Sequence, residues 1–320
     1  LRKVTRKIMV IDDLADRRHD CDVLLDQNYY LDMNHRYLDK VPDSCQLLLG
    51  PRYALLREEF RKLRPHIKPR DGKVRRILVF FGGIDADNYT GLTIQALSQL
   101  DIKDFAVDVV IGAQHPFRIA IEQACTEAGF ICHVQTTRMA ELMAAADLAI
   151  GAGGSATWER CCLGLPAICV CVADNQHQQI SDAAEQGLIY SLSPYGDFIR
   201  SFQRHISVIL ENELLLKMIS SIGTREVDGL GSKRIATVLG VNNIQIRTAN
   251  ELDSIKLFEW RNHPSIRAVS KNTNPIAWDD HQVWFDRVLS DKNKVLLIGE
   301  IDKSPVGVVR FDQEDDVALL

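Results

Sequence analysis

Between residues 77 and 191, short runs of consecutive apolar residues alternate with longer segments that mix apolar and polar positions. The runs are rich in Val, Ile and Leu and predict strands at 77–81, 105–111, 131–134, 148–151, 166–172 and 188–191. The segments between them predict helices at 89–100, 117–128, 138–146, 156–163 and 176–186. Strands that are apolar throughout, alternating with helices, are typical of a doubly wound parallel sheet.

The residues before this region follow a different pattern. Apolar strands are expected at 7–11, 23–25 and 46–49, with few helices between them. Because so few helices cannot cover both faces of a parallel sheet, residues 1–65 predict the C-terminal part of an incomplete α/β domain. The polar, basic stretch 61–76, with two prolines and a glycine, predicts a linker into a second domain over residues 66–240.

The pattern changes again after Asn242–Asn243. A strand is expected at 244–249, helices at 252–260 and 278–289, and a hairpin of strands at 295–301 and 306–311. Asn262-His-Pro264 ends the first of these helices, since proline cannot continue the helical hydrogen-bond pattern. The sequence stops at Leu320 within an element, so residues 241–320 predict a partial third α/β domain.

Composition narrows the range of partners. The net charge is −5, the pI is about 6.0, and no Lys/Arg block is present, which argues against nucleic acid. The longest apolar runs, such as 166–172, have strand length, which argues against a membrane helix. Eight scattered cysteines without a Cys-x-x-Cys pair indicate reduced thiols in the cytoplasm. No cluster of residues with metal-ligand spacing is visible, so no metal ligands are assigned, and dependence on a metal stays open.

Two glycine-rich loops follow predicted strands. Gly82-Gly83 comes after the strand at 77–81, with Asn88 just before the next helix. Gly154-Ser155 comes after the strand at 148–151 and opens a helix. Glycine lets a ligand approach the backbone closely, and the first N–H groups of a helix attract anions. The pair of loops predicts a nucleotide diphosphate site; the alternative is two tight turns that hold no ligand.

Together with Cys161–Ile168 and Ala173–Gln179, these loops resemble the nucleotide half of MurG-like proteins, which have two Rossmann domains in the GT-B arrangement. The resemblance implies that Gly82 and Gly83 lie at the phosphates and that Glu159 binds the ribose hydroxyls. It places Asn175 and Gln176 beside the sugar or phosphate. The alternatives are an exposed helix charge for Glu159 and a turn or helix cap for Asn175. The candidate substrate-binding residues are Gly82, Gly83, Asn88, Gly154, Ser155, Glu159, Asn175 and Gln176.

A closer resemblance covers residues 1–240. Ile11–Asn28, Gly50–Phe60, Gly82–Asp85 and Ala173–Gln176 are similar, in the same order, to hydrolases of pseudaminic acid biosynthesis. The resemblance implies hydrolysis of UDP-2,4-diacetamido-2,4,6-trideoxy-β-L-altropyranose to the free sugar and UDP, without a cofactor. The family's base is a histidine in a Gly-rich segment that would precede Leu1. We therefore expect this chain to bind a UDP-sugar but to hydrolyse it poorly.

Two histidines remain as catalytic alternatives. His19 is the nearest candidate by position, although a structural role beside Arg17 and Asp20 is favoured. His177 follows Gln176, and a surface role is favoured for it. The catalytic residues therefore stay open at this point.

Residues 241–320 resemble the beginning of a GNAT acetyltransferase. The matching segments are Ile246–Ala249, Leu257–Asn262, Ile276–Trp278, Trp284–Phe285 and Pro305–Phe311, with Arg267, Ser270 and His281. A complete domain of this type uses acetyl-CoA, but the glycine turn that would bind its pyrophosphate is missing, so no acetyl transfer is expected. The Trp and Phe residues at helical spacing are interpreted as part of the hydrophobic core rather than as the walls of a substrate pocket.

The expected fold is therefore α/β: a GT-B-like pair of Rossmann-type domains, the first incomplete, followed by a partial GNAT α+β domain. The expected function is UDP-sugar hydrolysis in the cytoplasm, with no nucleic acid or membrane as partner. A MurG-like UDP-sugar glycosyltransferase and a non-catalytic UDP-sugar-binding fragment are the alternatives.

Overall fold

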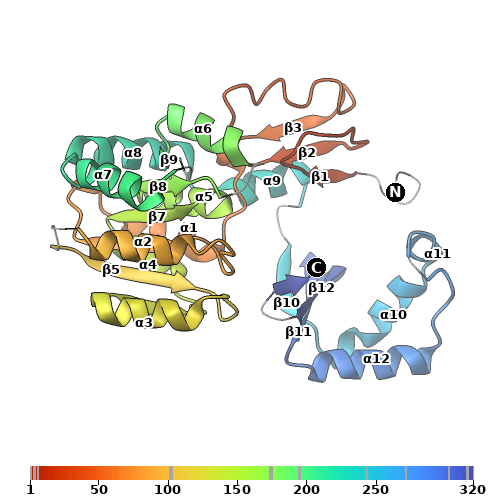
Figure 1. The fold of residues 1–320 in the computed structure, drawn as a ribbon. Helices are drawn as coiled ribbons and strands as arrows, with labels where there is room; N and C mark the ends of the chain where they lie inside the picture. Colours follow the sequence, from red (N-terminus) through yellow and green to blue (C-terminus); the bar gives the residue numbers. More distant parts are fainter. Residues whose placement is uncertain are drawn as a thin grey trace. The chain divides into compact units, whose positions relative to one another are not determined.

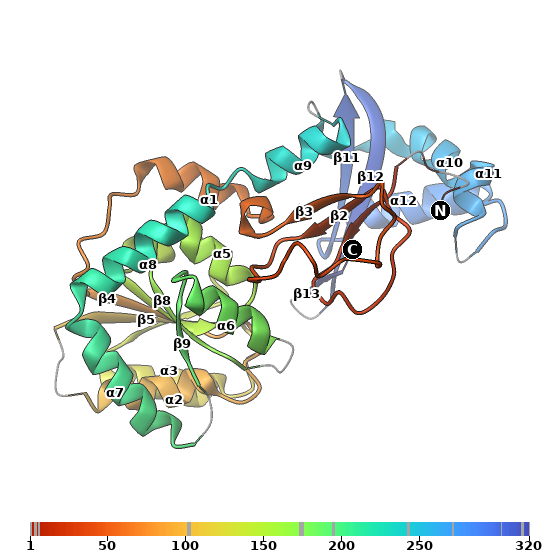
Figure 2. The same cartoon turned by 90° about the horizontal axis from the view of Figure 1, so that it is seen from above.

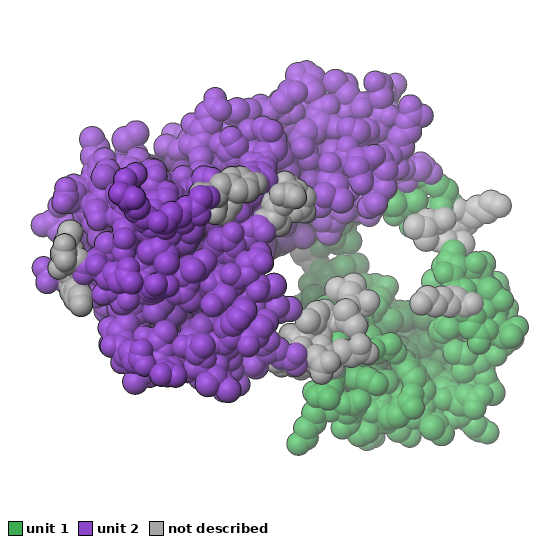
Figure 3. All heavy atoms as spheres, in the orientation of Figure 1, with its two compact units in different colours: residues 1–8, 236–320 green, residues 9–235 purple. Residues whose placement is uncertain are grey.

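The chain forms two compact units in the computed structural model (Figure 3). Residues 9–235 form unit 2, and residues 1–8 with 236–320 form unit 1. The structure describes residues 2, 5, 7–100, 104–172, 176–193, 196–241, 244–270, 272–301, 303–314 and 317–319, with side chains as far as residue 312. Each unit is described by itself, and the expected three-domain division at 65/66 and 240/241 stays a prediction.

The larger sheet of unit 2 has six strands, all parallel. They are β4 (Arg76–Phe80), β5 (Ala106–Ile111), β6 (Ile131–Val134), β7 (Leu148–Ala152), β8 (Ala167–Val170) and β9 (Tyr190–Leu192). Their order is β6-β5-β4-β7-β8-β9, and every neighbouring pair is parallel. The predicted strands are confirmed with shifts of one or two residues at most of their ends, and the doubly wound parallel sheet is confirmed with them.

Helices cover both faces of this sheet (Figures 1 and 2). In β4, Ile77 and Val79 belong to one core cluster and Leu78 to the other, because successive side chains point to opposite faces. The Ile77 side is covered by α2 (Tyr89–Ser98), α3 (Arg118–Ala128) and α7 (Phe198–Leu210). The Leu78 side is covered by α4 (Met139–Ala145), α5 (Ser155–Cys162) and α6 (His177–Glu185). Helix α8 (Glu213–Glu226) also belongs to unit 2, and α9 (Gly231–Leu239) includes residues of both units.

A smaller parallel sheet precedes it in the sequence. Strands β1 (Met9–Ile11), β2 (Val23–Asp26) and β3 (Gln46–Leu49) lie in the order β1-β2-β3. A 3-10 turn, η1 (Pro51–Tyr53), and helix α1 (Glu58–Leu63) then lead, through η2 (Arg64–His66), toward β4.

The connecting stretch is bound tightly to the six-stranded part. The Arg64 guanidinium donates to the carbonyls of Cys162, Thr224 and Val227 at 2.6–2.8 Å. Arg70 donates likewise to Gly164 (2.8 Å) and to Ala146 and Met143. The basic residues of this linker therefore satisfy carbonyls near helix ends, which would otherwise lack partners.

Unit 1 contains an antiparallel sheet with helices beside it. The strands are β10 (Gln245–Thr248), β11 (Lys294–Ile301), β12 (Ser304–Glu314) and β13 (Val317–Leu319), paired in that order. The helical segments are η4 (Glu251–Asp253), α10 (Ser254–Asn262), α11 (Pro264–Arg267) and α12 (Trp278–Ser290). The helix break predicted at 262–264 is confirmed. In the described part of the chain, we find no helix with the length and apolar character needed to span a bilayer.

Candidate functional site

The order of the six strands defines a switch point between β4 and β7. From β4 the chain proceeds outward through β5 and β6, and then returns to the other side of β4 to place β7, β8 and β9. In open α/β sheets, ligands bind outside the carboxyl ends of the strands at the point where the strand order reverses. The loops that follow β4 and β7 are the two loops that carry Gly82-Gly83 and Gly154-Ser155.

The loop after β4 is open at its glycines and rigid beyond them. A Cβ atom added at Gly82 or Gly83 would meet no atom within 4 Å, and Gly82 has a φ of 105°. The Asp85 carboxylate accepts from the N–H groups of Tyr89 (3.1 Å) and Thr90 (2.7 Å) at the start of α2. Asn88 caps the same helix by accepting from the Gly91 N–H at 3.1 Å. Backbone at Gly82-Gly83 is thus accessible, while Asn88 Oδ1 is committed to the helix cap.

A buried histidine lies beside this loop. The His115 side chain is fully buried, and its Nε2 lies 3.6 Å from Asp85 Oδ2. Its Nδ1 accepts from the Phe117 N–H at 3.2 Å, so Nε2 carries the proton. His115 was not among the residues predicted for the site, although it follows Gly112 just after a predicted strand. The sequence does show a polar residue in a loop at the carboxyl edge of the sheet, and that pattern could have indicated it.

The loop after β7 presents backbone in a similar way. Gly154 has a φ of 111°, and an added Cβ would have only Gln176 Nε2 nearby, at 3.8 Å. Helix α5 begins at Ser155 without a side-chain cap. The Thr157 N–H donates to the Gly154 carbonyl at 2.9 Å, and the N–H groups before it can face an anion. The Oε1 atom of Gln176 is buried against this loop and has no hydrogen-bond partner in the described part of the chain.

Glu159 lies on α5, one turn beyond this loop. Its side chain is 15% exposed, and Oε1 lies 3.1 Å from Nε of Arg57. Burial raises the pKa of Glu159, and the Arg57 guanidinium opposes this effect to a smaller extent. Glu159 is therefore a partly desolvated, paired carboxylate rather than a charge on a solvated helix face.

The smaller sheet meets the six-stranded part at this same edge. Asn28, two residues after β2, is buried and accepts from Trp158 Nε1 of α5 (3.2 Å) and Gln179 Nε2 of α6 (3.1 Å). The Leu31 N–H donates to Asp182 of α6 at 3.0 Å. The carboxyl end of β2 therefore faces the helices that carry Glu159 and follow Gln176.

The structure brings most of the predicted site residues to one edge of the sheet: Gly82, Gly83, Gly154, Ser155, Glu159 and Gln176. Asn88 is beside them as a helix cap, and Asn175 lies outside the described residues. His19 lies at the edge of the smaller sheet, and His177 is the first residue of α6. Among the described residues, no group of three or more His, Cys, Asp or Glu converges as a metal site. The binding roles of these residues stay predictions.

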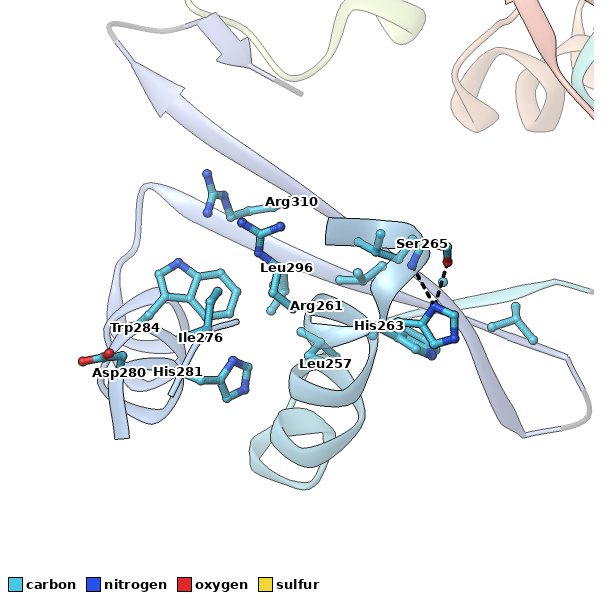
Figure 4. Close-up of a pocket in the computed structure, with 15 residues that line it drawn as sticks. Leu257, Arg261, His263, Ser265, Ile276, Asp280, His281, Trp284, Leu296 and Arg310 are labelled. Atoms are coloured by element: carbon cyan, nitrogen blue, oxygen red, sulfur yellow. Dashed lines mark hydrogen bonds between the residues drawn. The ribbon is translucent and has the colours of Figure 1, made fainter. Parts of the chain in front are cut away.

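Unit 1 contains a cavity of about 890 Å³ between its helices and its sheet (Figure 4). Its wall includes Trp260, Arg261, His281, Trp284 and Arg310. The interpretation of the aromatic residues as core is confirmed for Phe285, which is fully buried. Trp260 and Trp284 pack against that core and also line the cavity.

Comparison with known proteins gives a match over the middle of the chain. Residues 76–186 match the model of the glycosyltransferase family 28 C-terminal domain. This segment runs from β4 to the end of α6 and contains both glycine loops and Glu159.

Three curated relatives extend beyond that segment. A Methanocaldococcus jannaschii protein described as uncharacterized protein MJ1062 is 24% identical over 289 residues, covering 85% of this chain and 57% of the relative. The spore coat polysaccharide biosynthesis protein SpsG of Bacillus subtilis is 28% identical, covering 62% and 59%. The UDP-2,4-diacetamido-2,4,6-trideoxy-β-L-altropyranose hydrolase of Campylobacter jejuni is 26% identical, covering 57% and 63%. The chain thus spans about three fifths of the length of these relatives.

A solved structure shows the fold. MurG from Acinetobacter baumannii superimposes with a TM-score of 0.51 at 15% identity, covering 75% of this chain and 68% of that chain. Together with the parallel sheet, this likeness confirms the GT-B-like Rossmann α/β fold expected from the sequence. The resemblance of residues 241–320 to acetyltransferases stays a prediction. The alignment with the Methanocaldococcus protein is longer than unit 2, so it includes part of unit 1 as well.

Proposed function

We propose that unit 2 binds a UDP-sugar at the switch point between β4 and β7. The observation that carries this proposal is the pair of open glycine loops on either side of that point. The diphosphate lies against the backbone of Gly82-Gly83 and the first turn of α5 in this proposal. Neither loop places a side chain in the way, and the uncapped N–H groups of α5 favour negative charge.

Glu159 is proposed to bind the ribose. Arg57 occupies its Oε1, which leaves Oε2 to accept a hydrogen bond from a hydroxyl. A hydrogen bond to a charged, partly desolvated carboxylate is stronger than one to a neutral acceptor in water. Gln176, whose Oε1 lacks a partner in the described part, is proposed to bind the sugar or the phosphate beside Gly154.

The reaction proposed is hydrolysis of the bond between the sugar and the diphosphate. Water forms a bond to the anomeric carbon and gives up one proton to the solvent, the bond from that carbon to the β-phosphate oxygen breaks, and UDP leaves with the bonding electrons. The ordered motifs over residues 11–176 and the similarity to the Campylobacter hydrolase support this reaction. The substrate proposed is a UDP-linked diacetamido-trideoxy sugar.

Transfer of the sugar to an acceptor other than water is a second candidate. The description of the family model that matches residues 76–186 favours it, since that family is named for glycosyltransferases. Both reactions use the same UDP site and differ in the group that attacks the anomeric carbon.

Release of UDP in H₂¹⁸O distinguishes the candidates. If hydrolysis is correct, incubation with the UDP-sugar alone yields a free sugar and UDP that carries no ¹⁸O, because water attacks the anomeric carbon and not the phosphorus. UDP release that requires an added acceptor would establish transfer instead. Absence of UDP binding by calorimetry would contradict both proposals.

A further inference from the structure

A cluster of buried polar residues lies at the carboxyl edge of the smaller sheet. Asp12 follows β1, and Asp26 ends β2; their side chains are 3% and 2% exposed. The Tyr37 hydroxyl bridges them, at 3.1 Å from Asp12 Oδ2 and 3.0 Å from Asp26 Oδ2. Because β1 and β2 are parallel, their carboxyl ends share one edge, and this explains why residues 14 positions apart meet.

His19 is placed against this cluster. Its side chain is 10% exposed, and Nε2 lies 3.6 Å from Asp12 Oδ1, beyond hydrogen-bond distance. Nε2 is buried and has no partner in the part of the chain that the structure describes. Leaving a buried polar atom without a partner is costly, so Nε2 is an unsatisfied hydrogen-bonding atom beside Asp12.

The cluster is not suited to an anion. Two carboxylates lie at its centre, and two guanidiniums already face them: Arg36 Nε lies 3.5 Å from Asp26 Oδ2, and Arg17 lies 3.9 Å from Asp12 Oδ1. Arg36 also stacks on Tyr30 and donates to the Asp13 carbonyl. The low exposure of Asp12 and Asp26 shows how little solvent reaches the cluster, and burial raises the pKa of Asp26 accordingly. Carboxylates, a phenol and an imidazole in one place match the hydroxyl and amide groups of a neutral sugar, which donate and accept hydrogen bonds.

The cluster also lies next to the proposed nucleotide site. Asp26 Oδ1 accepts from the Asn28 N–H at 3.0 Å, and Asn28 in turn bonds Trp158 and Gln179. One residue, Asn28, therefore links the cluster to α5 and α6. If the phosphates lie at the loops after β4 and β7, as proposed, we expect the sugar to lie on the side of the smaller sheet.

We propose that the Asp12–His19 pair contacts the sugar of the bound nucleotide sugar, with Asp12 orienting the imidazole and the exposed edge of the ring bonding a sugar hydroxyl or amide. This inference rests on the proposed UDP site and adds a specificity-determining residue to it. The sequence suggested His19 only by its position, whereas the structure places its side chain beside the buried Asp12.

Equilibrium binding of UDP and of UDP-N-acetylglucosamine to the 320-residue chain tests the proposal. For His19→Ala and Asp12→Asn, the ratio of the two dissociation constants should change by about 3- to 10-fold, the worth of one hydrogen bond. The dissociation constant for UDP itself should stay unchanged, which also shows that the variants fold. His35→Gln is the matched control, since His35 pairs with Asp32 in the same part of the chain but is 65% exposed.

An unchanged ratio in both variants would overturn the role of the pair. The same conclusion follows if the ratio changes equally in the His35→Gln control. Loss of UDP binding by the unaltered chain would instead contradict the proposed UDP site, and the inference would fall with it. The two failures are distinguishable because only the second abolishes binding of UDP alone.

Discussion

At the scale of single residues, Glu159 shows how burial and pairing act together on one carboxylate. Glu159→Ala should weaken UDP binding by about 1.5–3 kcal/mol, the usual worth of a hydrogen bond to a charged group. Isothermal calorimetry measures this directly. Glu141→Ala is the control, because Glu141 is an exposed carboxylate paired with Arg138 on α4. Equal UDP affinities for the Glu159 variant and the unaltered chain would show that Glu159 does not contact the nucleotide.

The raised pKa of Glu159 adds a prediction on pH. Burial favours the protonated form, so protonation begins at a higher pH than for an ordinary glutamate. Because the pKa of Glu159 is higher in the folded state, its contribution to the free energy of unfolding is largest at pH values below its unfolded pKa. That contribution is lost as the pH rises through the folded pKa. Hydrogen bonding to ribose needs the ionised form, so UDP affinity should fall as pH decreases through the raised pKa.

Comparison with Glu159→Gln isolates this effect from the titration of the phosphates. The variant's affinity should vary less with pH than that of the unaltered chain over the same range. Parallel pH profiles for the two proteins would show that Glu159 stays ionised or does not contact the ligand.

At the scale of elements, the two kinds of glycine in unit 2 have different roles. A Cβ on Gly151 of β7 would lie 1.9 Å from the Phe80 carbonyl oxygen of β4, whereas a Cβ on Gly83 would meet nothing within 4 Å. Gly151→Ala should therefore lower the free energy of unfolding by about 3 kcal/mol through forced separation of the strands. Gly83→Ala should leave stability nearly unchanged and weaken UDP binding, because the methyl group lies where the phosphate approaches.

Urea denaturation and UDP calorimetry on both variants separate these roles. A strongly destabilised Gly83→Ala variant, or one that binds UDP normally, would contradict the assignment of this loop to the ligand.

Much of the six-stranded sheet could be predicted from the sequence because its strands are buried on both faces and read as continuous apolar runs. The exact ends of the strands were harder to predict from the sequence. The strand predicted at 166–172 ends at Val170, the last residue paired with both β7 and β9. The strand predicted at 7–11 begins at Met9, where pairing with β2 begins. These limits depend on neighbouring strands that lie far away in the sequence.

The site was predictable only where one loop carries the signal. The glycines of both loops stand out in the sequence, but the contact between His115 and Asp85 joins two loops and has no local pattern. The same holds for Asn28, whose partners Trp158 and Gln179 lie more than 100 residues away. Strand order, which brings the two glycine loops to one switch point, is likewise absent from any single segment.

At the scale of the whole molecule, ligand stabilisation should be confined to one unit. The proposed phosphate loops and Glu159 all lie in unit 2, so UDP should protect residues 70–235 and leave unit 1 unaffected. At a hundred times its dissociation constant, a one-site ligand adds about 2.7 kcal/mol to the free energy of unfolding. Thermal unfolding with UDP measures the size of the stabilisation. Hydrogen exchange detected by mass spectrometry locates the protected residues. If saturating UDP protects no residues of unit 2, the proposed nucleotide site is wrong.

The buried contact between Asn28 and Trp158 has an optical consequence. Of the four tryptophans in the chain, Trp158 alone belongs to unit 2, and the other three are Trp260, Trp278 and Trp284. Replacing those three with phenylalanine would leave one indole, fully buried, whose N–H bonds the loop after β2. The emission colour of that single fluorophore would then report, in real time and without a label, whether the two sheets of unit 2 part when a ligand arrives.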